Sequence, residues 1–436
     1  MYLLRIYSNP ELLKSSIYIK RNTFLKFCIF ALLFLCIYTP PIKVFPFSPL
    51  YIIIFISILY SLFRFNAFVS FFAGRNYTLI ALQFLVLFVY ALIMDVFTNY
   101  VDDIPLSRKY VVNILLLAIN FFFTSFFFLD LIKRTITTNP FKIIRIFLIL
   151  SILQSFIVVI MIFFPEFREH VFHNLLSFKD EKIFRPDLWI KRSYGISSQY
   201  LFAMPIYQGI GIILAYIFSL KYSFKYLFYI PFLIISILFN ARIGIVAMPL
   251  IIIIHSSFAF FYLRTKDILK VFKVISIIIL VILLLVFIIG KFFDITYFQY
   301  TLIWLLETVN EGGNIQNINV LRNHVFLPQK TSEILFGQGR YLTMNSAEIY
   351  NSDIGYINYI FFGGLIFSIL LYLVIAEISL IAFVKCKSIY EKSIILGLLF
   401  LVFIANFKGI AFTSNSFIVT FFLINLTISN RDRYNI

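Results

Sequence analysis

A series of long, uninterrupted apolar runs constrains the fold of this chain more than any other feature. Most are about 17–25 residues long, the length of an α-helix that crosses a bilayer. They are continuous rather than alternating, which excludes the pattern of a membrane β-barrel. About twelve such runs are present, near 24–42, 47–63, 77–97, 110–132, 143–164, 200–220, 225–239, 243–263, 271–290, 354–376, 393–407 and 409–428. The sequence therefore predicts an all-α polytopic integral membrane protein with about twelve transmembrane helices in a single membrane domain, residues 1–436.

The composition agrees with a membrane class. The chain is 61% hydrophobic and only 13% charged. A protein dissolved in water could not cover its surface with so few polar side chains. We therefore expect the apolar runs to face lipid or one another.

The basic residues indicate how the helices cross the membrane. The chain has 37 Lys and Arg against 20 Asp and Glu, a net charge of +17. With the N-terminus in the cytoplasm, the short loops on that side are basic, as at 133–145 and 264–273, which satisfies the positive-inside rule. Both termini are then cytoplasmic. The charge reports topology, so no nucleic-acid partner is predicted.

This orientation places two long loops on the outer face of the membrane, at 165–199 and 291–353. The second is mostly polar although long apolar runs lie on both sides of it. Long connections within a membrane domain are usually functional or disordered. We expect the aqueous chemistry of the protein in these two loops.

The first loop carries Arg185 and Arg192 before a Gly195-Ile-Ser-Ser turn that opens the next helix. Helix N-termini attract anions, and arginine pairs bidentately with phosphate. One interpretation is a phosphate-facing corner around Arg192 and Gly195. The alternative is a set of ordinary interfacial cations, with Trp189 as a membrane anchor.

Arg242 stands at the tip of a hairpin, in ILFNARIGIVAM. A charge near the bilayer centre costs about 2.5–3.5 kcal/mol, and less near an interface. Arg242 is therefore expected to face a water-filled cavity or an anion. Snorkelling to the outer surface is the alternative.

The second loop contains Arg322 and His324, then an FGQG sequence followed by Arg340. Gly337 and Gly339 predict a tight turn or a close backbone approach. Asp353 lies where the chain re-enters an apolar helix, which suits a carboxylate at a cavity mouth. Ser352 or Asp353 is also a good helix N-cap, and the two interpretations are compatible.

The remaining residues of interest are interpreted as structural. Gly363-Gly364 are expected to allow close helix packing. His170 and His173 with nearby glutamates complete no recognised metal pattern, so no metal is predicted. His255, inside an apolar run, is interpreted as a buried helix-contact residue. No nucleotide-binding or serine-hydrolase motif occurs, and no cofactor is predicted.

The order of these features resembles the O-antigen polymerases of the Wzy type. The resemblance rests on the number of spans, the two outer loops, N-A-R-I-G at 240–244, L-F-G-Q-G at 335–339 and S-D-I-G-Y-I-N-Y-I-F-F-G-G at 352–364. The family carries an R-x10-G motif in each long loop. Here Arg185 and Gly195 enclose nine residues, and Arg322 has no glycine at the matching distance.

The resemblance implies an enzyme of the bacterial inner membrane. Such a glycosyltransferase joins undecaprenyl-pyrophosphate-linked oligosaccharide repeat units on the periplasmic face, beside a flippase and a chain-length regulator. It implies that loop arginines hold the pyrophosphate, here Arg192, Arg242 and Arg322, with Arg340 and Arg185 as further candidates. Asp353 is the first candidate for the catalytic base and His324 the second.

Two other functions stay open. O-antigen ligases share the loop arginines, but usually carry a histidine near the position of Asp353. A lipid-linked oligosaccharide flippase would need charges within its spans and two similar halves. The spans here are nearly free of charge, which favours the polymerase.

Overall fold

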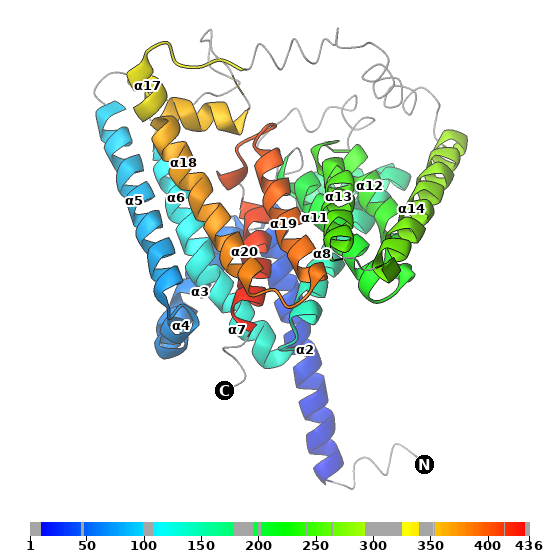
Figure 1. The fold of residues 1–436 in the computed structure, drawn as a ribbon. Helices are drawn as coiled ribbons and strands as arrows, with labels where there is room; N and C mark the ends of the chain where they lie inside the picture. The colour runs from blue at the N-terminus through cyan, green and yellow to red at the C-terminus, as the bar shows by residue number, and fades with distance from the viewer. Residues whose placement is uncertain are drawn as a thin grey trace, which may run out of the picture.

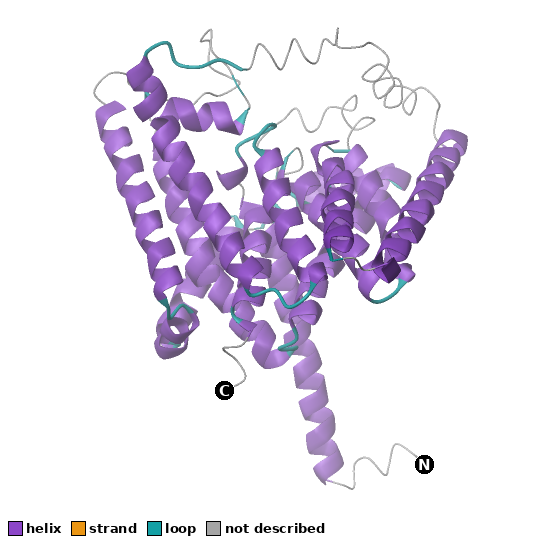
Figure 2. Cartoon of the chain, viewed as in Figure 1, coloured by secondary structure: helices purple, strands orange, loops and turns teal. Residues whose placement is uncertain are grey.

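The computed structural model describes residues 10–44, 48–98, 108–177, 195–198, 202–240, 242–262, 265–292, 325–339, 352, 354–413 and 415–431. Within these residues the chain is almost entirely helical (Figure 2), and the extended pairing is limited to an isolated bridge between Ile42 and Leu176. The helices follow the chain as α2 (Pro10–Tyr38), α3 (Pro49–Phe63), α4 (Phe65–Phe71), α5 (Arg75–Thr98), α6 (Arg108–Ile119), η1 (Asn120–Thr124), α7 (Ser125–Thr135), α8 (Pro140–Phe163), α9 (Pro165–His170), η2 (Val171–Leu175), α11 (Ala203–Lys221), η4 (Phe224–Tyr229), α12 (Ile230–Leu238), η5 (Arg242–Val246), α13 (Ala247–Phe261), α14 (Thr265–Phe292), α17 (Thr331–Phe336), α18 (Gly355–Val384), α19 (Ile389–Ala405), η6 (Ala411–Thr413) and α20 (Asn415–Ser429).

Six helices in the described part are long and apolar enough to cross a membrane, or seven if α3 and α4, bent by 98°, form one span. The six are Arg75–Phe97, Lys109–Thr135, Pro140–Phe163, Ala203–Lys221, Ile243–Phe261 and Gly355–Val384. This confirms the all-α class and the pattern of a multi-pass membrane protein. The count of about twelve stays a prediction.

Helix α11 lies at the centre of the bundle. Every residue from Ala203 to Leu220 is buried, and the helix contacts α8, α12, α13, α19 and α20. In Figure 1, α5, α6 and α18 stand on one side of the bundle and α11 to α14 on the other, with α19, α20 and α2 between them. A helix apolar all round requires such an enclosed position.

The outer surface of the bundle is apolar. Helix α5 exposes Leu82, Leu85 and Val89, and α14 exposes Phe272 and Leu283. Monomeric soluble proteins rarely present such contiguous apolar faces to water. These faces therefore fit contact with lipid acyl chains.

Buried polar side chains join helices in pairs. His255 of α13 is fully buried, and its Nδ1 lies 2.8 Å from Ser393 Oγ of α19, which confirms its interpretation as a helix-contact residue. Asp130 of α7 accepts a hydrogen bond from Tyr60 Oη at 2.6 Å and pairs with Arg134 at 2.9 Å. Polar contacts of this kind hold apolar helices in one register.

Candidate functional site at the loop end of the bundle

The structure brings several of the predicted segments to one end of the bundle. This end carries α17 and the first turns of α18, at the top of Figure 1, and we call it the loop end. The start of α2 and the end of α20 lie at the opposite end, which we call the basic end.

The FGQG sequence forms a tight turn. Gly337 and Gly339 have φ of 83° and 69°. The amides of Gln338 and Gly339 donate to the carbonyls of Phe361 and Phe362 at 2.7 and 2.8 Å. A Cβ at Gly337 would lie 2.3 Å from the Phe362 oxygen. The turn is thus docked directly on the backbone of α18.

The docking point on α18 is a helix break. Gly364 has φ 68° and ψ −171°, and a Cβ there would lie 2.2 Å from the Leu335 oxygen. Tyr90 of α5 donates its hydroxyl to the carbonyls of Phe336 and Gly363, at 3.0 and 2.9 Å. A break frees backbone groups that need partners, and the tyrosine and the turn supply them. The predicted close packing at Gly363-Gly364 is confirmed, and a bend accompanies it.

Glu333, in α17, stabilises the turn because its carboxylate accepts a hydrogen bond from a side chain of the turn. Gln338 Nε2 donates to Glu333 Oε2 at 2.7 Å, and Lys330 Nζ lies 3.5 Å from Oε1. The Gln338 hydrogen bond is the main cause that lowers the pKa of Glu333, and Lys330 adds to it. The carboxylate is therefore ionised at neutral pH and serves the turn rather than an acid–base role.

Two described parts of the first predicted loop are fixed to residues 38–41, where α2 ends. The amide of Ser198 donates to the Tyr38 carbonyl at 3.2 Å, and its hydroxyl lies 2.6 Å from Thr39 Oγ1. The Ser177 amide donates to the Pro41 carbonyl at 2.7 Å. Ser177 and Ser198 are therefore both held beside the end of α2.

Gly195 lies at a close contact between this loop and α8. Its φ is 60°, and a Cβ there would lie 2.2 Å from Gln154 Nε2. Gln154 is buried. Gly195 therefore lies in a backbone conformation that a side chain could share only by displacing Gln154.

Further glycine contacts join the other segments. A Cβ at Gly244 of η5 would lie 2.0 Å from the Pro205 oxygen in the first turn of α11. A Cβ at Gly409 would lie 2.8 Å from the Phe202 ring, and one at Gly355 would lie 2.4 Å from the Gly409 oxygen. The tip of the Arg242 hairpin, the start of α11 and the start of α18 are therefore connected through close contacts of the backbone and of the Phe202 ring.

The charged candidates themselves are mostly not described. Arg242 belongs to η5 by its backbone, and its side chain is not described. The residues outside the described part are Arg185, Arg192, Arg322, His324, Arg340 and Asp353. Their convergence on one ligand stays a prediction, while the segments next to Arg192, Arg242 and Asp353 do share the loop end.

The predicted N-cap of α18 is wrong. The cap residue is Ile354, without a side-chain cap bond. The amide of Gly355, the first helical residue, donates instead to the Asn406 carbonyl at 2.8 Å. Ser352 Oγ accepts from the Ile354 amide one position earlier, at 3.2 Å. A tertiary contact therefore satisfies the helix end that a local cap was expected to satisfy.

Two residues at the loop end were not anticipated. Tyr90 had no sequence signal, because a tyrosine in an apolar run is common in this chain. Asp95 is buried, with 9% exposure, five residues beyond Tyr90 on α5. A carboxylate within an apolar run is a functional signal in its own right, and the ALIMDVF sequence offered it.

Among the described residues, no three His, Cys, Asp or Glu side chains gather as metal ligands. Comparison of the chain with known protein families, curated proteins and solved structures finds no match.

Proposed function

We propose that the chain is a membrane glycosyltransferase that polymerises undecaprenyl-pyrophosphate-linked oligosaccharide repeat units. The observation that carries the proposal is made at the loop end, where the FGQG turn contacts α18, and where the start of α18, the start of α11 and the Arg242 hairpin are connected by close contacts. These are the segments in which the resemblance to O-antigen polymerases resides. Their contacts link distant parts of the sequence at one site.

The leaving group explains the need for arginines. Transfer breaks the bond between the anomeric carbon and a pyrophosphate oxygen, and negative charge develops on that oxygen. Preorganised cations in a poorly solvated site stabilise such charge strongly. Arg192, Arg242 and Arg322 take this role in the proposal, with Arg340 and Arg185 as supporting residues. No nucleotide or metal is required for this step.

The acceptor hydroxyl loses its proton as its oxygen attacks the anomeric carbon. A carboxylate within hydrogen-bond reach serves as the base, and Asp353 is our first choice, His324 the second. The neighbours of Asp353 support this order. Ser352 and Ile354 are buried, and the Gly355 amide is tied to Asn406. A rigid backbone on both sides suits a positioned base.

A single displacement inverts the anomeric centre. Linkage analysis of the polymer against the lipid-linked donor tests this point. An inverted linkage supports direct transfer. A retained linkage would count against it, because retention needs a second displacement.

Genetic complementation tests the proposed function. Deletion of the gene should leave lipid A core carrying a single repeat unit, whereas loss of a ligase or flippase leaves none. In the deletion strain, Arg192→Ala and Arg242→Ala should insert normally and fail to restore the glycan ladder. Arg75→Ala, an exposed arginine at the start of α5, is the matched control and should restore it. Normal ladders from both loop-end variants would remove these arginines from the mechanism.

A further inference from the structure

The basic end of the bundle contains a cavity that the proposed transferase chemistry does not use. Its volume is about 610 Å³, and it lies between the start of α8, the end of α11 and η4. Its polar lining includes Lys142, Arg145, Lys225, Tyr222, Tyr226 and Tyr229. We call it the basic pocket. The volume falls in the range typical of small-molecule sites.

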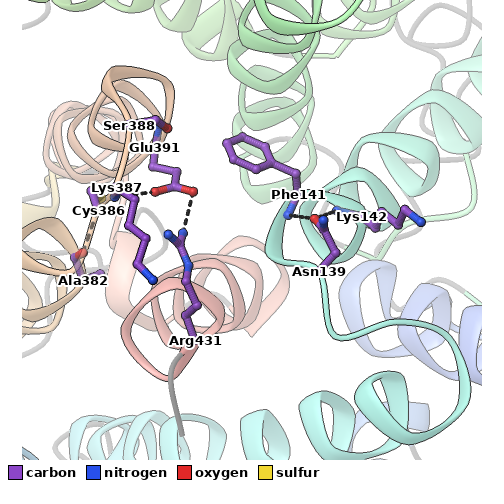
Figure 3. A network of polar contacts seen from close by, with 9 residues as sticks. All are labelled: Asn139, Phe141, Lys142, Ala382, Cys386, Lys387, Ser388, Glu391 and Arg431. Atoms are coloured by element: carbon purple, nitrogen blue, oxygen red, sulfur yellow. Dashed lines mark hydrogen bonds and ion pairs between the residues drawn. The ribbon is translucent and has the colours of Figure 1, made fainter. Parts of the chain in front are cut away.

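The described lining of the basic pocket is positively charged. Three cationic side chains line it, and none of its described lining residues carries a carboxylate. Glu391 of the neighbouring α19 is bound elsewhere, because Arg431 Nη2 lies 2.5 Å from it and the Lys387 amide donates to it at 2.8 Å. Figure 3 shows Lys142 pointing away from the Glu391–Arg431 pair. Like charges gathered without a counter-ion favour an anionic ligand.

The cations are held by ordered backbone. Asn139 Oδ1 accepts from the amides of Phe141 and Lys142 at 3.0 and 3.3 Å, which caps α8 (Figure 3). The N-terminal end of that helix adds partial positive charge beside Lys142. The Arg145 guanidinium lies 5.6 Å from the centre of the Tyr226 ring. The cations of the pocket are exposed to solvent, and the capped backbone and the Tyr226 ring position two of them.

The surroundings place the pocket at a membrane interface. Tyrosines 222, 226 and 229 line it, and tyrosine is enriched where chain meets lipid headgroups. Phe228 and Phe232, beside them in the chain, are 69% and 38% exposed. Apolar exposure next to a cationic cavity matches an amphipathic ligand, whose acyl chains lie along the bundle while its headgroup enters the pocket.

We propose that the basic pocket binds the phosphate group of an anionic phospholipid headgroup. Basic pockets between transmembrane helices on the cytoplasmic side have this ligand class, and the predicted topology places the basic end there. The inference is independent of the glycosyl transfer at the loop end. Lys142, Arg145 and Lys225 contact the phosphate, and the tyrosines fix the depth of the headgroup.

Lipid titration of the full-length chain tests this inference. Purified protein in neutral detergent is titrated with phosphatidylglycerol, and bound lipid is counted by native mass spectrometry. The triple variant Lys142→Gln, Arg145→Gln, Lys225→Gln should bind about 100-fold more weakly, since each basic residue near a lipid surface contributes roughly fivefold. The control triple Lys26→Gln, Arg75→Gln, Lys385→Gln removes the same charge outside the pocket and should bind as the parent does.

Further measurements distinguish a lipid headgroup from free phosphate, and a loss of phosphate contacts from a loss of folding. Phosphatidylcholine should bind much more weakly than phosphatidylglycerol, and millimolar inorganic phosphate should not displace the lipid. Displacement by inorganic phosphate, or equal losses in the two triples, would overturn the proposal. The variant Lys142→Arg, Lys225→Arg should keep parental binding. If the pocket triple does not fold, Lys142→Gln alone, at an exposed side chain, should lose about fivefold, and unchanged binding would contradict the site.

Discussion

Glycines at the loop end allow backbone segments to touch where any side chain would separate them. Gly337 and Gly364 both have positive φ, and a Cβ on either would lie within 2.3 Å of a carbonyl oxygen of the other segment. A non-glycine residue in such a conformation costs about 1–3 kcal/mol before any steric overlap is counted. These two positions therefore determine whether the FGQG turn stays on α18.

Gly364→Ala should destabilise the protein by about 3 kcal/mol or more, because backbone strain and the contact with Leu335 add together. Thermal unfolding in detergent measures the loss, and the glycan ladder should weaken with it. Gly397→Ala in α19 is the control, since its Cβ would meet only side-chain carbons at 3.2 Å or beyond. Equal behaviour of the two variants would contradict the docking of the turn.

Tyr90→Phe should cost about 0.5–1.5 kcal/mol, because the single hydroxyl hydrogen that the two carbonyls share is lost. The carbonyls of Phe336 and Gly363 lose their donor. Tyr51→Phe removes a hydroxyl from an exposed side chain and should change little. The unfolding temperatures of both variants provide the comparison.

The Glu333 carboxylate makes the turn sensitive to acid. The pKa of Glu333 in the folded chain lies below the ordinary value of 4.5. Its contribution to the stability of the turn is therefore fully present above about pH 4.5. The contribution is lost as pH falls through the lower folded pKa. Hydrogen exchange over residues 331–339, corrected for intrinsic rates, should accelerate in that window. The variant Gln338→Leu, which lacks the main donor, should show a weaker response, and an identical response would contradict the assignment.

At the scale of elements, hydropathy predicted where helices lie and missed how they bend. The long apolar runs became helices because transfer into lipid favours them. The run at 47–63 ends in a 98° bend at Arg64, which pairs with Asp130 at 3.7 Å. The break at Gly364 depends on Leu335 and Tyr90, which are distant in sequence. Such tertiary partners leave no local signal.

The anchoring of the first loop on the end of α2 can be tested by cross-linking. The hydroxyls of Thr39 and Ser198 lie 2.6 Å apart, so cysteines at these positions should form a disulfide under mild oxidation. Loss of free thiol in Thr39→Cys, Ser198→Cys relative to each single variant measures the bond. Retention of both free thiols would show that Ser198 does not lie beside Thr39.

At the scale of the molecule, the two ends of the bundle differ in chemistry. The loop end joins segments predicted to meet a diphosphate, and the basic end contains the cationic pocket. The charge distribution of the sequence predicts such a polarity, and the sequence also predicts turns at Gly195, Gly337 and Gly339. It did not identify Asp95 as a candidate, or the contact of Gly355 with Asn406, since burial and pairing across helices depend on the assembled fold. The positions of the predicted arginine side chains lie beyond the described residues.

The central claim is that arginines from separate outer segments meet around one diphosphate at the loop end. A cryo-electron microscopy structure of the full chain with a non-hydrolysable undecaprenyl pyrophosphate analogue tests it most directly. We expect guanidinium nitrogens of Arg192, Arg242 and Arg322 within about 4 Å of the diphosphate oxygens, the reach of an ion pair, with the Asp353 carboxylate beside the anomeric position. An analogue bound elsewhere, or these arginines on opposite faces of the membrane, would contradict the account.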